Sequence, residues 1–325
     1  SLVESLDILQ KESVNKKLQK IITQIKKEVE EGKAFSETLA KHPEVFPTTY
    51  IKMVAAGELS GKLEESLEQI ETQMKKTHEL TSTIRGAMIY PSVILAAMMG
   101  VGIFMVIVVL PKLTVIFKEF DTKLPLATRA LIAITDVMSN PLYLAIIILT
   151  IIGCISGFVT LLKKEPRFRQ FVHNTNLHVP IFGTVIKNIN LAQFSLTLSS
   201  LLRSAIPIMD DIEITAATCS NVQYKKALKN TTEEIQTGKP LSEILRKNQF
   251  LFPPIVTEMI MVGERSGEVD QLLSELSDFY GKTVDKTMKN FTTIIEPVII
   301  LVLGLAVGGM SVAVIMPMYT LMQNF

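Results

Sequence analysis

Residues 57 to 61 read GELSG, and residues 263 to 267 read GERSG, 206 positions later. Aligning the chain with itself at this offset, without gaps, pairs residues 32–67 with residues 238–273 and gives 14 identities in 36 positions. Chance would give roughly two or three, so the chain contains a duplicated unit. The same offset pairs Pro91 with Pro297, which extends the match into apolar sequence.

Three apolar segments explain why 48% of the residues are hydrophobic. Residues 89–110 and 141–162 contain no charged residue, and residues 294–316 contain one, Glu296. Segments of this length can cross the ~30 Å hydrocarbon layer as helices, whereas buried helices of soluble proteins rarely lack a polar face over such a distance. The sequence therefore predicts transmembrane helices over 89–111, 141–162 and 294–316.

The distribution of positive charge predicts the topology of these crossings. All 33 lysines and arginines lie outside the three spans, and only four of them lie in the loop 111–140. By the positive-inside rule, the segments before the first span and after the second face the cytoplasm. The N-terminus is then cytoplasmic, and the loop and the C-terminus lie outside.

Segment 191–291 has the apolar spacing of helices and no sustained alternation of the kind found in strands. Its apolar spacing, prolines and glycines predict an amphipathic helix over 191–205, further helices over 207–219, 221–238, 240–248 and 255–267, and a last helix that starts near residue 268 and continues into the membrane. This is a bundle of about six helices.

Because Ser1 aligns with Pro207, the first repeat has no counterpart of residues 191–206. We therefore expect an N-terminally truncated first bundle, from a longer protein.

The fold class predicted from these patterns is an all-α membrane protein with two duplicated cytoplasmic helical bundles and three transmembrane helices. A pattern typical of an interfacial amphipathic helix occurs in the outer loop. The expected segments are a truncated first bundle (1–88), a span (89–111), the outer loop with its interfacial helix (112–140), a span (141–162), a second bundle (163–293), a span (294–316) and an outer tail (317–325).

The repeated phrase is typical of a tight turn between two helices. Its glycines suit the turn, and its serine can cap the helix that follows. Turn geometry does not explain the glutamate, which either binds backbone or a basic neighbour inside the bundle or belongs to a corner that binds a partner. The candidate structural-turn or partner-binding residues are Gly57, Glu58, Ser60, Gly61, Gly263, Glu264, Ser266 and Gly267.

Nothing in the sequence favours catalysis. There is no phosphate-binding loop of the GxxxxGK[ST] kind, and the four histidines show no metal-ligand spacing. The two cysteines, Cys154 in a span and Cys219 in a bundle, are expected in different compartments and cannot pair. We predict no catalytic residue, no cofactor and no metal. Neither bundle is basic enough to favour nucleic acid.

Glu296 is the charged residue of the third span and a candidate functional group by its position. At the 206-residue offset its counterpart is Tyr90, and each precedes a proline, Pro297 or Pro91. One interpretation is a hydrated carboxylate at the cytoplasmic edge of the bilayer. The other is a contact that receives a polar or positive group of a partner within the membrane, formed by Glu296, Pro297, Tyr90 and Pro91.

Several of these features together resemble one family. The GExSG turns, the prolines that open the first and third spans, the LPLATR stretch at 124–129 and the Glu296–Pro297 pair resemble the GspF/PilC-type inner-membrane platform proteins of type II secretion and type IV pilus systems. The resemblance covers nearly the whole chain. It implies a non-enzymatic assembly platform in the bacterial inner membrane, with a periplasmic loop and C-terminus.

The resemblance also implies partners. These are a hexameric cytoplasmic ATPase, pilin or pseudopilin subunits drawn from the bilayer, other inner-membrane assembly proteins and further copies of the chain, at least as a dimer. Two other functions stay open, a homo-oligomeric channel or transporter subunit lined by Glu296 and nearby glycines, and a membrane scaffold unrelated to pili. Continuous helical patterns over 66–110 and 268–316 would carry motion from a bundle into the bilayer.

Overall fold

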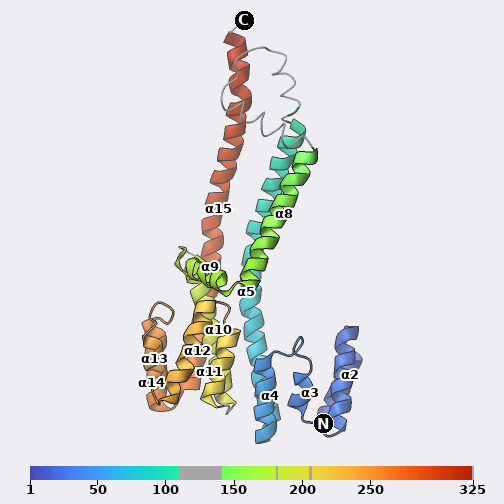
Figure 1. The fold of residues 1–325 in the computed structure, drawn as a ribbon, viewed down its shortest axis with the longest axis vertical. Helices are drawn as coiled ribbons and strands as arrows, with labels where there is room; N and C mark the ends of the chain where they lie inside the picture. The colour runs from blue at the N-terminus through green and yellow to red at the C-terminus, as the bar shows by residue number, and fades with distance from the viewer. Residues whose placement is uncertain (110, 112–140, 181, 205–206, 324–325) are drawn as a thin grey trace. The chain divides into compact units, whose positions relative to one another are not determined.

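The computed structural model describes residues 1–109, 111, 141–180, 182–204 and 207–323 (Figure 1). The predicted outer loop, with its interfacial helix and the LPLATR stretch, lies outside these residues. Within the described ranges the chain is helical and contains no strand, which confirms the all-α class. The helices are α1 (Leu2–Glu12), α2 (Lys16–Glu30), α3 (Phe35–Ala40), α4 (Thr48–Ser60), α5 (Leu63–Phe104), the π-helical turn η1 (Met105–Val109), α8 (Pro141–Lys164), α9 (Pro166–His178), α10 (Phe182–Arg203), α11 (Ile208–Thr218), α12 (Val222–Gln236), α13 (Leu241–Arg246), α14 (Pro254–Ser266) and α15 (Val269–Gln323).

The helix bounds follow the offset found in the sequence. Each of α1, α2, α3 and α4 begins and ends 206 positions before α11, α12, α13 and α14 respectively, and α5 begins 206 positions before α15. Asn15 and Asn221 cap α2 and α12 in the same way, because each side-chain oxygen accepts a backbone N–H of the first turn. We call residues 1–88 the first segment and residues 163–293 the second segment. The same local signals therefore start the same helices in both segments.

The described helices group into two compact units. The first unit contains residues 1–82 and 173–285, and the second contains residues 83–172 and 286–325. Residues from both predicted bundles thus belong to the first unit.

Helix α10 occupies the centre of the first unit. The sequence predicts an amphipathic helix over 191–205, but α10 begins earlier, at Phe182. Its middle is buried on nearly every side, including Leu191, Phe194, Leu198 and Leu201. The amphipathic interpretation is wrong for the middle of α10, because neighbouring helices cover it on nearly every side, so even Ser195, Thr197 and Ser199 lie inside the unit.

Apolar side chains from both segments share one core. Ile25, Phe35 and Met53 of the first segment pack in one cluster with Leu201 of α10 and Ile214 of α11. A second, aromatic contact lies among residues of the second segment, where Phe252 meets the rings of Phe194 and Tyr224 at 5.3 and 5.4 Å between centroids. Leu201 and Ile214 therefore supply apolar surface to the first segment's core.

The second unit contains the membrane-length helices. Two of the described helices are long and apolar enough to cross a membrane, α5 and the Val269–Gly309 part of α15. Both continue without a break through their prolines, Pro91 and Pro297. Helix α8 coincides with the segment predicted as the second span, and a crossing by α8 stays a prediction.

The glycines of the repeated phrase have two separate tasks. Gly61 and Gly267 end α4 and α14 with φ of +71° and +80°, a left-handed conformation that favours glycine. Gly57 and Gly263 are buried where the next helix passes closely. A Cβ on Gly57 would lie 2.6 Å from Ser66 Cβ, and one on Gly263 would lie 2.8 Å from Val269 Cα. The glycines thus let consecutive helices approach at the turn.

We expect Gly57→Ala to destabilise the first unit by about 1–3 kcal/mol, because the added methyl group overlaps the buried Ser66 side chain. The apparent melting temperature of the purified chain in detergent, followed by circular dichroism, measures the effect. Gly86→Ala on α5 is the matched control, since a Cβ there meets nothing within 4 Å. An equal melting temperature for Gly57→Ala and the parent chain would contradict the close approach.

Candidate functional site

The glutamates of the repeated phrase bind the start of a short helix. Glu58 accepts hydrogen bonds from the Phe35 N–H at 2.6 Å, the Ser36 N–H at 3.1 Å and the Ser36 hydroxyl at 2.7 Å. In the second segment Glu264 accepts from the Leu241 N–H at 2.6 Å, the Ser242 N–H at 3.4 Å and the Ser242 hydroxyl. Each carboxylate therefore clamps the N-terminus of α3 or α13 onto α4 or α14.

These clamps are needed because the short helices have no cap of their own. The residues that precede α3 and α13 are Ala34 and Pro240, and neither makes a side-chain capping bond. The first amides of a helix have no partner within the helix, and a carboxylate suits its positive end. Glu58 and Glu264 satisfy these amides from outside. A role of the same corner in binding a partner stays a prediction.

The serines of the phrase act differently from the prediction. Ser60 donates to the Ala56 carbonyl at 2.8 Å, and Ser266 donates to the Gly263 carbonyl at 3.4 Å. Both bonds lie within the helix that ends at the turn. The expectation that these serines cap the following helix is wrong, because left-handed Gly61 or Gly267 separates the serine from that helix and its hydroxyl reaches the preceding turn instead.

The hydrogen bonds also set the charge of Glu58. Burial raises the pKa of its carboxyl, but the bonds from Ser36 and from the two backbone amides outweigh burial and leave the pKa below its ordinary value. The ionised form is thus the one that the fold prefers.

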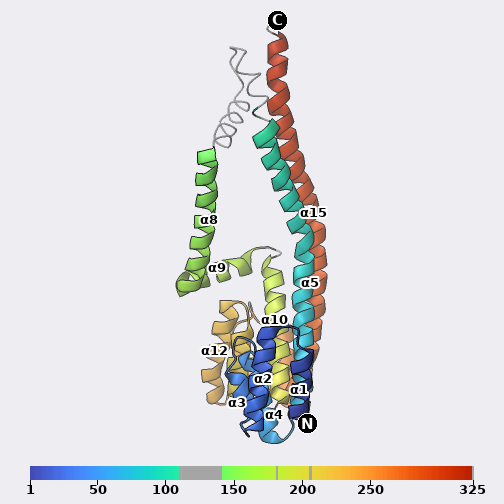
Figure 2. The same cartoon turned by 90° about the vertical axis from the view of Figure 1, so that its right-hand side faces the viewer.

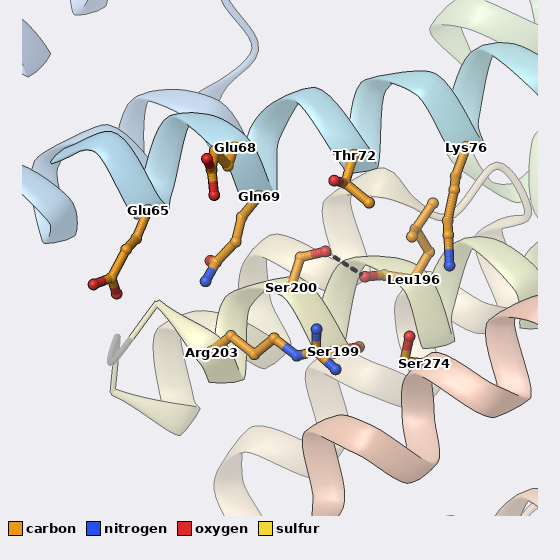
Figure 3. A pocket seen from close by; sticks show the side chains of 10 residues that line it. All are labelled: Glu65, Glu68, Gln69, Thr72, Lys76, Leu196, Ser199, Ser200, Arg203 and Ser274. Atoms are coloured by element: carbon orange, nitrogen blue, oxygen red, sulfur yellow. Dashed lines mark hydrogen bonds between the residues drawn. The ribbon is translucent and has the colours of Figure 1, made fainter. Parts of the chain in front are cut away.

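A polar cleft of about 280 Å³ lies in the first unit among α5, α10 and α15. Figure 3 shows side chains of α5 facing those of α10, with Ser274 of α15 beside them. No sequence pattern predicts this cleft, because its residues lie far apart in the chain and match no motif. The lining residues are Glu65, Glu68, Gln69, Thr72, Lys76, Leu196, Ser199, Ser200, Arg203 and Ser274.

Polar bonds close the cleft along its edges. Lys76 Nζ lies 2.6 Å from Asp278 of α15, and the Ser204 hydroxyl donates to Gln69 at 2.9 Å. Arg203 Nε pairs with Asp270 at 3.0 Å. Such partly exposed ion pairs contribute little stability individually. The contacts of α5 with α10 and α15 along this cleft are therefore specific in geometry but easily exchanged for water.

An acid inside the first unit was also missed. Asp211 of α11 is fully buried, and neither carboxylate oxygen has a hydrogen-bond partner among the described residues. Burial, with a smaller contribution from the charge of Asp210, raises the pKa of Asp211 to about 7. Because this value lies above that of an unfolded aspartate, about 3.9, Asp211 costs stability increasingly as the pH rises from about 4 to about 7.

In the second unit the structure brings the predicted membrane residues together. The Tyr90 hydroxyl donates to Glu296 Oε1 at 3.4 Å, a long hydrogen bond. The two residues are 206 positions apart, so equivalent positions of α5 and α15 face each other. Pro91 and Pro297 follow them in the two helices. Sequence alone pairs these positions by alignment, and the structure pairs them in space.

The described residues hold no group of three or more histidine, cysteine, aspartate or glutamate side chains suited to a metal ion. Among the histidines, His173 accepts the Val222 N–H through Nδ1 at 3.3 Å, and His178 stacks on Phe250 at 4.8 Å between centroids. Both rings are thus engaged in contacts of the first unit.

We expect Glu58→Gln to accelerate hydrogen exchange of the α3 amides about tenfold to a hundredfold at neutral pH, because charge-assisted bonds of roughly 1.5–3 kcal/mol are lost. Exchange measured by mass spectrometry on peptides covering Phe35–Ala40 reports this. Since the pKa of Glu58 is lowered in the fold, its stabilisation is complete above the unfolded value of about 4.3 and is lost as the pH falls through the folded value. The difference between variant and parent should therefore shrink in acid.

Glu64→Gln is the matched control, since Glu64 lies exposed in the first turn of α5 and makes no hydrogen bond or ion pair with the described residues of α3. Unchanged exchange of α3 in Glu58→Gln, or equal acceleration in both variants, would contradict the clamp.

Comparison with known proteins gives consistent results over the whole chain. The family model described as type II secretion system (T2SS), protein F, matches residues 1–111 and 194–317. The chain is 33% identical over 320 residues to the type IV pilus assembly protein PilC of Thermus thermophilus, covering 98% of this chain and 78% of that protein. It is 32% identical to PilC of Pseudomonas aeruginosa, covering 98% and 85%.

Similarity also extends to secretion proteins. The type II secretion system protein F of Pseudomonas aeruginosa is 28% identical over 320 residues, which cover 98% of this chain and 78% of that protein. The family match covers more than half of the chain, and the similarity to the PilC proteins covers nearly all of it. With its membrane-length helices and its repeated corners, this chain belongs to the type II secretion system protein F family, the GspF/PilC family that its sequence resembles.

Proposed function

We propose that this protein is a non-enzymatic assembly platform in the bacterial inner membrane, acting in a type IV pilus or type II secretion machine. The observation that carries this proposal is the similarity to pilus assembly and secretion proteins over nearly the whole chain. Two membrane-length helices support the location. In this proposal α8 is a third crossing, two duplicated helical bundles face the cytoplasm with the N-terminus, and the C-terminus is periplasmic.

The helices that connect cytoplasm and membrane suggest how the platform would work. Both α5 and α15 continue from residues of the first unit into residues of the second without a break. A hexameric ATPase that turns or tilts the cytoplasmic helices would therefore move the membrane segments with them. The polar cleft favours such motion, because its hydrogen bonds and ion pairs can exchange partners at little cost. Other copies of the chain and other inner-membrane assembly proteins complete the machine.

Tyr90 and Glu296 are the proposed contact for a pilin or pseudopilin helix. A carboxylate in a membrane span is costly unless it has partners, and one long bond from Tyr90 leaves further acceptor capacity on Glu296. A positive or strongly polar group of a pilin, arriving through the bilayer, would satisfy it. The prolines beside both residues free backbone carbonyls one turn earlier, which adds acceptors near the same place.

We expect Glu296→Gln to abolish fibre assembly or secretion while the protein still inserts into the membrane, because the amide removes the charge that attracts the partner. Tyr90→Phe is the matched variant, and it should retain most activity because the carboxylate is kept. Electron microscopy of surface fibres, with membrane fractionation as the insertion control, checks both outcomes. Normal fibres from Glu296→Gln would refute the contact.

Deletion of the gene, complemented from a plasmid, tests the proposed function itself. We expect loss of surface fibres by electron microscopy, or loss of specific proteins from the medium with fibres intact, and the result assigns the machine. Complementation should restore the phenotype, and pull-down of the complemented protein should recover a secretion ATPase. If fibres and secreted proteins both persist after deletion, the platform proposal fails and a channel or scaffold function replaces it.

A further inference from the structure

The end of α8 carries a helix of a different kind. Helix α8 is apolar up to the basic pair Lys163 and Lys164, and after Glu165 the chain starts α9 at Pro166. A proline at this place suits the first turn of a new helix and cannot donate the hydrogen bond that would continue α8. Figure 2 shows α9 leaving the end of α8 sideways.

Contacts fix α9 at both ends. Phe168 meets Phe158 of α8 edge to face, with 5.7 Å between the ring centroids, and both residues belong to the second unit. In the second half of α9, the His173 carbonyl accepts a hydrogen bond from Asn221 Nδ2 at 3.2 Å, a contact within the first unit. Leu177 is buried there as well. Within the second unit, the contact with Phe158 therefore fixes the side of α9 that carries Phe168.

The first half of α9 is amphipathic in an unusual way. At about 100° per residue, Phe168, Phe171 and Val172 share one face, and Arg167 and Arg169 lie at its two edges. Phe171 is 69% exposed, although aromatic side chains are ordinarily covered. This arrangement of an apolar face with arginines on both sides is typical of helices that lie at a membrane surface.

Four basic side chains gather at this place. Lys163, Lys164, Arg167 and Arg169 fall within seven residues, all are exposed, and Glu165 is the acid among them. Within the described part of the chain, none of the four makes an ion pair. Other lysines of the chain are also exposed, for example Lys226 and Lys229 on α12, but those do not follow an apolar membrane-length helix.

We propose that Pro166–Val172 lies in the headgroup layer of the bilayer, that these four basic side chains bind the phosphates of anionic phospholipids, and that Phe171 enters the acyl boundary. The inference rests on the proposed membrane crossing by α8. Positive charges at the end of such a crossing meet the anionic surface of the cytoplasmic leaflet, and each contributes roughly a fivefold preference for it. An exposed aromatic ring adds apolar contact at the same depth.

The chain contains no tryptophan, so Phe171→Trp introduces a single fluorescent reporter. The full chain with this reporter is reconstituted in vesicles of equal phosphatidylcholine and phosphatidylglycerol, with bromine on the acyl chains of one lipid or of the other. If the two lipids mix randomly around α9, the reporter is quenched equally whichever lipid carries the bromine. We expect brominated phosphatidylglycerol to quench at least about twofold more, because α9 gathers anionic lipid around it.

Two sets of variants make the test specific. Arg167→Gln with Arg169→Gln, in the reporter background, should bring the two quenching values together. Lys226→Gln with Lys229→Gln removes the same charge from exposed positions of α12 and should leave their ratio unchanged. Equal quenching by the two brominated lipids in the parent reporter would overturn lipid selection. Absence of quenching by either lipid would overturn the membrane position of α9, and an acidic protein partner would then be the candidate ligand of its basic side chains.

A second reporter separates this inference from the proposed function. Leu149 lies within α8 and is 75% exposed, so Leu149→Trp should be quenched in the acyl region by either brominated lipid if α8 crosses the bilayer. Quenching at position 149 without quenching at position 171 would refute the α9 inference alone. Absence of quenching at position 149 would refute the crossing by α8, and with it the proposed three-span platform.

Discussion

The carboxylates of Glu58 and Glu264 stabilise the two corners, which are the turns that end α4 and α14 and lead into the long helices α5 and α15. Each binds the unpaired amides at the start of a short helix, so α3 is held on α4 and α13 on α14. At the same corner a buried glycine lets the next helix pass at close distance, and a left-handed glycine turns the chain into it. The direction in which α5 and α15 begin is thus set by two short sequence elements of the same form.

Between these corners the first unit combines a firm core with a softer polar region. Leu201 and Ile214 pack with apolar side chains of the first segment, and burial of such groups resists separation. Along the cleft, in contrast, α5 meets α10 and α15 through hydroxyl, amide and charged groups such as Gln69 and Lys76. Bonds of this kind keep a defined geometry yet exchange readily with water.

The two repeats differ where their chemistry matters. Tyr90 and Glu296 occupy equivalent positions and face each other, one as donor and one as acceptor. Ser5 stands where the second repeat has the buried Asp211, and Leu18 stands where it has Tyr224, whose hydroxyl binds the Leu251 carbonyl at 2.7 Å. Duplication preserved the turns, which require particular residues, while these three positions became different.

The sequence by itself determined the all-α class, the bounds of α11 to α14 to within about two residues and the family, because periodicity, prolines, glycines and a 206-residue repeat are local or linear signals. It also selected Glu58, Glu264, Tyr90 and Glu296 as unusual. Only the tertiary structure decided that the two glutamates clamp short helices, that Ser60 and Ser266 bind the preceding turn, and that the middle of α10 is buried on nearly every side. It alone revealed the polar cleft and Asp211. These features depend on which residues, far apart in the chain, packing brings within a few ångströms, and no pattern along one segment records that.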